Sequence, residues 1–142
     1  MNPPAETPPL SADWSPVPPE EMRFLWSDLL RAAGETRSTV VSPEEVRQYL
    51  IRYSDVAPIA VELLQAARNV FGPDAEIALE LYRDAEIDDE YLRVLVRLRQ
   101  YREDFLQRLQ SISDAHDAKL SKLSGYISVT TDYQASAPHG TV

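Results

Sequence analysis

The chain has 142 residues, a length that suits a single domain with a buried core. Its apolar share of 44% and charged share of 26% are typical of globular proteins, and its net charge of −9 argues against binding to duplex nucleic acid or an anionic membrane surface. The absence of cysteine excludes disulfides, thiolate nucleophiles and thiolate metal sites.

The N-terminal part is predicted to be a leash followed by one helix. Residues 1–19 contain seven of the eleven prolines, which disfavour helix and remove backbone donors, so an extended or disordered segment is expected. Residues 20–41 are expected to form an amphipathic helix and a linker. The apolar residues of this helix recur at steps of three and four (Met22, Leu25, Trp26, Leu29, Leu30 and Ala33). Gly34 suits the position just past its C-terminus.

Two further helices are predicted before a β-hairpin. The first opens with Ser42, Pro43 and Glu45, the spacing of a capping box with proline in the first turn. The second is expected to begin between Asp55 and Pro58 and to end at Phe71, where the sequence GPD stops it.

Two independent sets of partners fix the register of the hairpin. One face pairs apolar side chains: Ile77 with Val96, Leu79 with Val94 and Leu81 with Leu92. In the same register the other face pairs Glu76 with Arg97, Ala78 with Leu95, Glu80 with Arg93 and Tyr82 with Tyr91. A slip by one residue would set leucines against arginines, so one sheet face is expected to be core and the other wet.

A long helix from Tyr101 to Ser124, ended by Gly125, and a third strand in YISVTTDY complete the expected domain. Residues 134–142 are predicted to be a flexible tail. The expected fold of residues 42–133 is a single α+β domain with a three-stranded, at least partly antiparallel sheet and helices packed on one face. The element order for the whole chain is αααββαβ.

Residues 42–133 resemble a group of small uncharacterised bacterial proteins. The hairpin loop pattern D-x-E-I-x-D-E-Y-L is DAEIDDEYL here, from Asp84 to Leu92, and the closing pattern S-G-x-x-x-V-T-T-D-[FY] is SGYISVTTDY, from Ser124 to Tyr133. The resemblance implies a helix pair, a hairpin, a long helix and a closing strand, with no activity to transfer. It suggests a small protein that works beside a partner, as toxin–antitoxin or defence-associated proteins do.

The hairpin tip holds five carboxylates within seven residues (Asp84, Glu86, Asp88, Asp89 and Glu90). An EF-hand needs glycine and glutamate where this chain has Asp89 and Leu95. The lysines that could assist a two-metal nuclease, Lys119 and Lys122, lie near the far end of the long helix. A solvated loop is therefore expected, with a docking surface for a basic partner and a metal or catalytic site as the alternatives.

Other catalytic patterns are missing from the sequence. His116 falls on the apolar stripe of the long helix and is expected to be hydrogen-bonded at the margin of the core, while His139 lies in the tail. There is no G-x-S-x-G motif and no glycine-rich phosphate loop. We therefore expect no enzyme activity, no cofactor and no metal. Tyr82, Tyr91 and Tyr126 leave stacking of single-stranded RNA on the wet face as an alternative to a charge-paired exterior.

The first helix carries a bulky apolar cluster of the kind that anchors helices in grooves (Met22, Phe24, Leu25, Trp26 and Leu29). It either covers its own domain or docks on another chain. Because neither a secretory signal nor a membrane-spanning run is visible, a cytoplasmic protein is expected.

These features predict a non-catalytic protein that binds and regulates another protein, as an antitoxin or immunity protein does. The apolar cluster and the acidic loop are its predicted partner-binding residues, and the partner is a basic or groove-bearing protein or a second copy. The alternatives are a small metal- or nucleotide-dependent enzyme that uses the acidic loop with Asp132, and a structural subunit of a homo-oligomer or larger complex.

Overall fold

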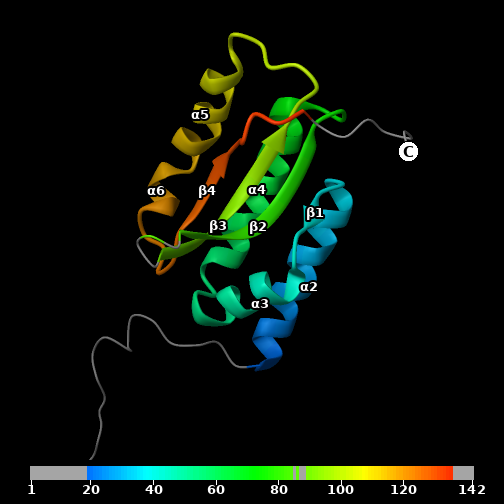
Figure 1. The fold of residues 1–142 in the computed structure, drawn as a ribbon. Coiled ribbons are helices and arrows are strands. Elements are labelled where there is room, and N and C mark those ends of the chain that lie inside the picture. The colour runs from blue at the N-terminus through cyan, green and yellow to red at the C-terminus, as the bar shows by residue number, and fades with distance from the viewer. Residues whose placement is uncertain (1–18, 85, 87–88, 136–142) are drawn as a thin grey trace, which may run out of the picture.

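The computed structural model describes residues 19–84, 86 and 89–135, which form an α+β fold (Figure 1). The elements in chain order are α2 (Pro19–Glu35), β1 (Thr39–Val40), α3 (Pro43–Arg52), α4 (Val56–Phe71), β2 (Glu76–Asp84), β3 (Asp89–Arg97), α5 (Phe105–Ala115), α6 (Asp117–Leu120) and β4 (Ile127–Thr130). The predicted leash, apart from Pro19, and most of the predicted tail lie outside the described residues. No described helix is long and apolar enough to cross a membrane.

The four strands form one mixed sheet in the order β1-β2-β3-β4. Strands β2 and β3 are antiparallel, and each pairs in parallel with its outer neighbour, β1 or β4. The hairpin register is the predicted one from Glu76 opposite Arg97 to Tyr82 opposite Tyr91, and the ladder continues to Asp84 opposite Asp89, in the segment that was expected to be a loop. The α+β class and the register are therefore confirmed, whereas the prediction of three strands is wrong.

The missed strand, β1, lies in the segment expected to be a linker. It is only two residues long, too short for an alternating pattern to reveal it. Positive φ angles at Arg37 (53°) and Ser42 (47°) turn the chain at both ends of β1. The Ser42 side chain makes no capping hydrogen bond, so the predicted capping box does not form. Gly34 lies inside α2 and not beyond it.

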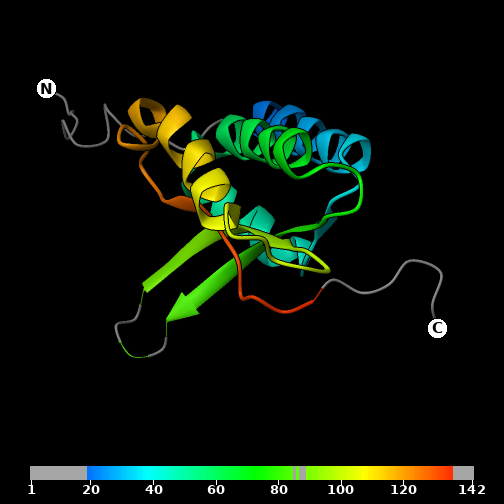
Figure 2. The same cartoon turned by 90° about the horizontal axis from the view of Figure 1, so that it is seen from above.

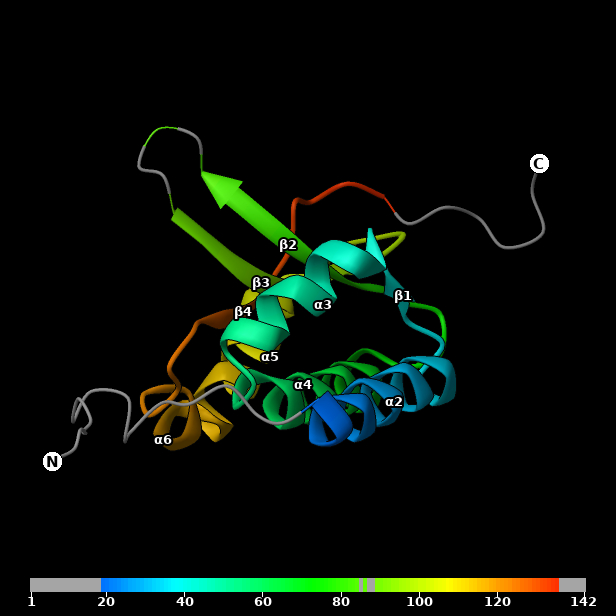
Figure 3. The ribbon, with the colours of Figure 1, turned by 90° about the horizontal axis from the view of Figure 1, so that it is seen from below.

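The helices gather on one side of the sheet and leave the opposite face open, as Figures 2 and 3 show. Fully buried side chains from α4 (Leu63 and Leu64) and from the inner face of the strands (Leu79, Val94 and Ile127) form the centre of the core. The face predicted to be core is therefore the one that carries the helices. The hairpin extends past these helices, so its outer end projects from the body (Figure 3).

The long helix predicted from Tyr101 to Ser124 is wrong in its bounds, because α5 ends at Ala115 and the four-residue α6 follows. The break lies at His116, whose backbone N–H bonds to Ser113 O three residues back. Its Nδ1 lies 2.9 Å from Ile112 O and its Nε2 lies 3.5 Å from Glu62, so the histidine is hydrogen-bonded at the core margin as predicted. The helical segment ends well before Gly125.

Candidate functional site

Three tyrosines form a row across the open sheet face at the projecting end of the hairpin. Tyr82 lies opposite Tyr91 in the β2–β3 ladder, and their ring centroids are 5.3 Å apart. Tyr126, just before β4, has its ring centroid 5.2 Å from that of Tyr91. The Tyr126 side chain is 53% exposed. Burial raises the pKa of Tyr91, with smaller contributions from the neighbouring tyrosines and the Asp84 carboxylate.

Asp84 and Asp89 lie beyond this row, as the last pair of the ladder. Side chains two residues apart on a strand share a face, so both carboxylates lie on the same side of the sheet as Tyr82 and Tyr91. Asp84 accepts a hydrogen bond from the backbone N–H of Glu86 at 3.0 Å. Neither aspartate has an ion pair with a cationic side chain among the described residues. We call Tyr82, Tyr91, Tyr126, Asp84 and Asp89 the tyrosine–carboxylate patch.

Glu90 lies on the opposite face and ties the hairpin to α3. Its carboxylate accepts a hydrogen bond from Arg83 Nε at 2.9 Å and also bonds Arg52 of α3. Arg83 in turn lies 3.6 Å from Glu45, also of α3. The hydrogen bond from Arg83 holds the pKa of Glu90 below its ordinary value. This predicted partner-binding carboxylate is therefore already engaged within the chain.

The described acidic residues at the hairpin end do not converge on a metal site. Glu86 is exposed, and Asp88 lies outside the described residues. Across residues 19–84, 86 and 89–135, no group of three histidine or acidic side chains could hold a metal ion. Among the described carboxylates at this end, Glu86 and Asp89 are exposed, Glu90 pairs with arginine, and the half-buried Asp84 accepts the backbone hydrogen bond from Glu86.

Asp132, which the enzyme alternative joins to the acidic loop, lies at the opposite end of β3 from that loop. Asp132 receives two hydrogen bonds from Arg97 at 3.1 and 2.7 Å. These bonds are the first cause of its lowered pKa, about 2. Arg97 is the last residue of the nine-residue β3, and such a strand spans roughly 26 Å from its first residue to its last.

The rest of the open face carries the charge pairs that the sequence predicts. Arg93 pairs with Glu80, and its guanidinium carbon lies 4.4 Å from the centroid of the Tyr82 ring. Arg97 lies 3.5 Å from Glu76 in addition to binding Asp132. The predicted pairs of Glu80 with Arg93 and of Glu76 with Arg97 are confirmed. The bond between Arg97 and Asp132 was missed because the position of β4 beside β3 cannot be read from a local pattern.

The N-terminal helix α2 packs on α4. As a result, some residues of its apolar cluster are buried and others are exposed. Met22 and Leu29 are buried in the core of the same domain, Leu25 and Trp26 are half-buried, and Phe24 is 71% exposed. Trp26 and Met22 also line a groove with Ile51 of α3. In the structure α2 covers its own domain, which is one of the two predicted alternatives for this helix.

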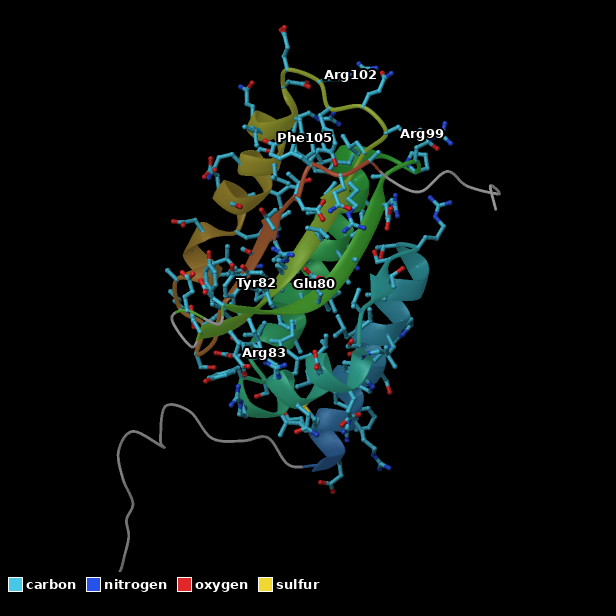
Figure 4. All side chains as sticks on the ribbon, in the orientation of Figure 1. Glu80, Tyr82, Arg83, Arg99, Arg102 and Phe105 are labelled. Atoms are coloured by element: carbon cyan, nitrogen blue, oxygen red, sulfur yellow. The ribbon has the colours of Figure 1, made fainter. Side chains whose placement is uncertain are left out.

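Arg99, Arg102 and Phe105 lie at the opposite end of the molecule from Tyr82 and Arg83 (Figure 4), and they line a second hollow. Phe71 and Phe105 line it together with Arg99, Arg102 and Arg108. Arg108 bonds Val70 O and lies over the Phe71 ring. Asp74 and Asp104 also line the hollow. Because charges of both signs meet there, the hollow does not favour one class of ligand.

Comparison with known proteins finds no family model, curated protein or solved structure that matches this chain. The resemblance to small uncharacterised bacterial proteins therefore stays a prediction.

Proposed function

We propose that this protein is a non-catalytic binding protein that takes a basic segment of a partner protein on the tyrosine–carboxylate patch. The proposal keeps the predicted regulatory role and the acidic loop as a contact surface. It moves the centre of that surface from the apolar cluster of α2 to the open end of the hairpin.

The observation that carries the proposal is the pairing of Asp84 with Asp89. Like charges directly opposite in an antiparallel ladder destabilise it, and no described cation neutralises this pair. Elsewhere on the same face, Glu80 and Glu76 each face an arginine across the ladder. A lysine or arginine from a partner would supply the missing positive charge.

The tyrosine row supports the same class of partner. Tyrosine rings attract cations through their faces and are enriched among the residues that dominate binding energy in protein interfaces. The Arg93 guanidinium lies over the Tyr82 ring, and this contact within the chain supports a cation as the partner's contact group. The exposed Tyr126 ring offers a further face to a partner's side chain.

More specifically, we propose an antitoxin or immunity-like role in the cytoplasm. It is supported by the net charge of −9, which suits an inhibitor that covers a basic surface. A basic surface that binds nucleic acid would be one such target.

Quantitative affinity capture from an extract of the source cells tests the proposal. The bait is the full chain, compared with a variant that carries Asp84→Asn and Asp89→Asn. We expect one stoichiometric partner with a basic contact segment, at least tenfold depleted with the variant because its charge partners are gone.

The matched control carries Glu103→Gln and Asp117→Asn, which removes the same charge from two exposed positions outside the patch. It should retain the partner. Equal capture by all three baits would refute a role for the patch, as would the absence of any stoichiometric partner.

A further inference from the structure

The outer edge of β2 is open for part of its length. Strand β1 pairs with β2 only at Ala78 and Leu79, and Val41 adds one hydrogen bond from its N–H to Leu79 O at 2.8 Å. At Ser42 the chain turns into α3. From Leu81 to Asp84, no described strand lies beside β2 on this edge.

The backbone groups of Leu81 and Arg83 point toward this open edge. In an antiparallel ladder, residues alternate between those that bond the partner strand and those that point away from it. Leu79 bonds Val41 on the β1 side, so Leu81 and Arg83, at steps of two, also point away from β3. Their N–H and C=O groups have no hydrogen-bond partner among the described residues.

The side chains along this edge determine which sequence an added strand would need. Leu81 and Arg83 alternate with Tyr82 and Asp84, so an added strand would meet an apolar side chain and an arginine on one face, and an aromatic ring with a carboxylate on the other. On the first face, Glu45 of α3 and Glu90 pair with Arg83, so its charges are already balanced, whereas Asp84 on the other face has no ion pair among the described residues. Charge complementarity therefore favours basic over acidic side chains in the added strand.

We propose that the partner binds as an extended strand added to the edge of β2 at Leu81–Asp84, with basic and apolar residues in alternation. Backbone hydrogen bonds to Leu81 and Arg83 give affinity, and the basic residues reach the tyrosine–carboxylate patch. The added strand continues the line that β1 occupies farther along the sheet. This inference rests on the proposed function and names its mode of binding.

Two substitutions at one position separate backbone from side-chain effects. Arg83→Pro removes the outward N–H and should leave the ladder to β3 intact, because proline is tolerated on an edge strand where its nitrogen faces solvent. Arg83→Ala loses the same ion pairs with Glu90 and Glu45 but keeps the N–H. The comparison of these two variants isolates the edge hydrogen bond.

The probe is a fluorescein-labelled heptapeptide of alternating lysine and valine, with a glutamate–valine peptide as its control, read by fluorescence polarisation. We expect the wild-type chain and Arg83→Ala to bind the lysine peptide. Binding should be at least tenfold weaker with Arg83→Pro, and at least tenfold weaker for the glutamate peptide on the wild-type chain. No binding by the wild-type chain overturns the proposal, as does equal binding by the two variants.

Amide hydrogen exchange on the wild-type chain decides the matter if Arg83→Pro does not fold. Saturating lysine peptide should slow exchange at Leu81 and Arg83 by at least tenfold, and unchanged exchange at both amides overturns strand addition. The proposed function and the strand addition can be refuted independently of each other. If the captured partner depends on Asp84 and Asp89 but Arg83→Pro captures it as well as Arg83→Ala does, the proposed function stands and strand addition is wrong.

Discussion

Asp84 and Asp89 face each other across the last pair of the hairpin ladder, with no described cation beside either carboxylate. Every other charged pair along this face of the hairpin joins an acidic residue to an arginine. Only the last pair of the described ladder sets two like charges opposite each other. Residues that serve binding are often retained at a cost to stability. The partner-binding account therefore makes a prediction about the free protein as well as about the complex.

Removing one of these charges should stabilise the free chain. We expect Asp89→Asn to raise the free energy of unfolding by about 0.2–1 kcal/mol, because a like-charge pair opposite in a ladder is destabilising by roughly that amount. Urea denaturation at low salt measures the change, which should shrink in 1 M salt. Glu103→Gln, exposed and away from the ladder, is the control and should change stability by less. A loss of stability in Asp89→Asn would contradict the account.

The bond between Arg97 and Asp132 should make stability depend on acid pH. The pKa of Asp132 falls from 3.8 to about 2 in the folded chain, so the folded state binds fewer protons than the unfolded state between these values. The stabilisation is complete above the unfolded pKa and is lost as pH falls through the folded one. We expect Asp132→Asn to lower the free energy of unfolding by about 1 kcal/mol at pH 7 and to match the parent only below the folded pKa. A deficit that does not shrink as pH falls through the folded pKa would indicate another cause.

Tyr49 should be required for the attachment of β4 to α3. Its hydroxyl accepts a hydrogen bond from Tyr126 N–H at 2.9 Å and lies 3.3 Å from Tyr126 O as a donor. Tyr49→Phe leaves both backbone groups without this partner, which should cost about 1–3 kcal/mol of unfolding free energy. Tyr126→Phe is the matched control, because only the backbone of Tyr126 takes part, and thermal denaturation should separate the two. Equal melting temperatures would show that solvent replaces the bond.

Leu29 and Phe24 should differ sharply as alanine substitutions in α2. Leu29 is fully buried in the core, so Leu29→Ala should cost about 2–5 kcal/mol, whereas Phe24 is 71% exposed and Phe24→Ala should change stability by less than about 0.5 kcal/mol. Urea denaturation of both variants is the measurement. A mild effect of Leu29→Ala would mean that α2 does not pack on its own domain in solution.

Two glycines should respond to alanine in opposite directions. A Cβ at Gly125 would lie 2.8 Å from the Tyr49 hydroxyl and 2.9 Å from Tyr53 Cβ, so Gly125→Ala should destabilise the chain by about 1–3 kcal/mol. Gly34 lies in α2 with no atom within 4 Å of such a Cβ, so Gly34→Ala should stabilise it by about 0.5–1 kcal/mol. Melting temperatures that move the same way in both variants would contradict these contacts.

The register of the hairpin could be predicted because two local patterns agree on it. Apolar residues and complementary charges select the same register, and each pattern lies within one continuous stretch of chain. The helices α3 and α4 were predicted for a related reason, since their apolar periodicity and the glycine after α4 are also local. The same register places Asp84 opposite Asp89. Only the structure shows that neither carboxylate has an ion pair among the described residues.

The remaining features depend on contacts between distant segments. Strand β1 pairs with residues almost 40 positions later, and its two residues carry no alternating pattern. The helix breaks at His116, whose backbone N–H bonds to Ser113 O. The apolar spacing of the sequence continues across this break and therefore does not predict it. The placement of Tyr126 beside Tyr91, which completes the tyrosine row, likewise depends on the parallel pairing of β4 with β3.

Site-specific photo-crosslinking in the source cells tests the central claim most directly. The photoreactive amino acid p-benzoylphenylalanine replaces Tyr126 in the tyrosine–carboxylate patch, or Phe24 on the exposed side of α2 as the competing surface. The account predicts a single partner adduct from the Tyr126 position, lost when Asp84→Asn and Asp89→Asn are added, and none from the Phe24 position. An adduct from the Phe24 position alone would contradict it and return the binding surface to the N-terminal helix.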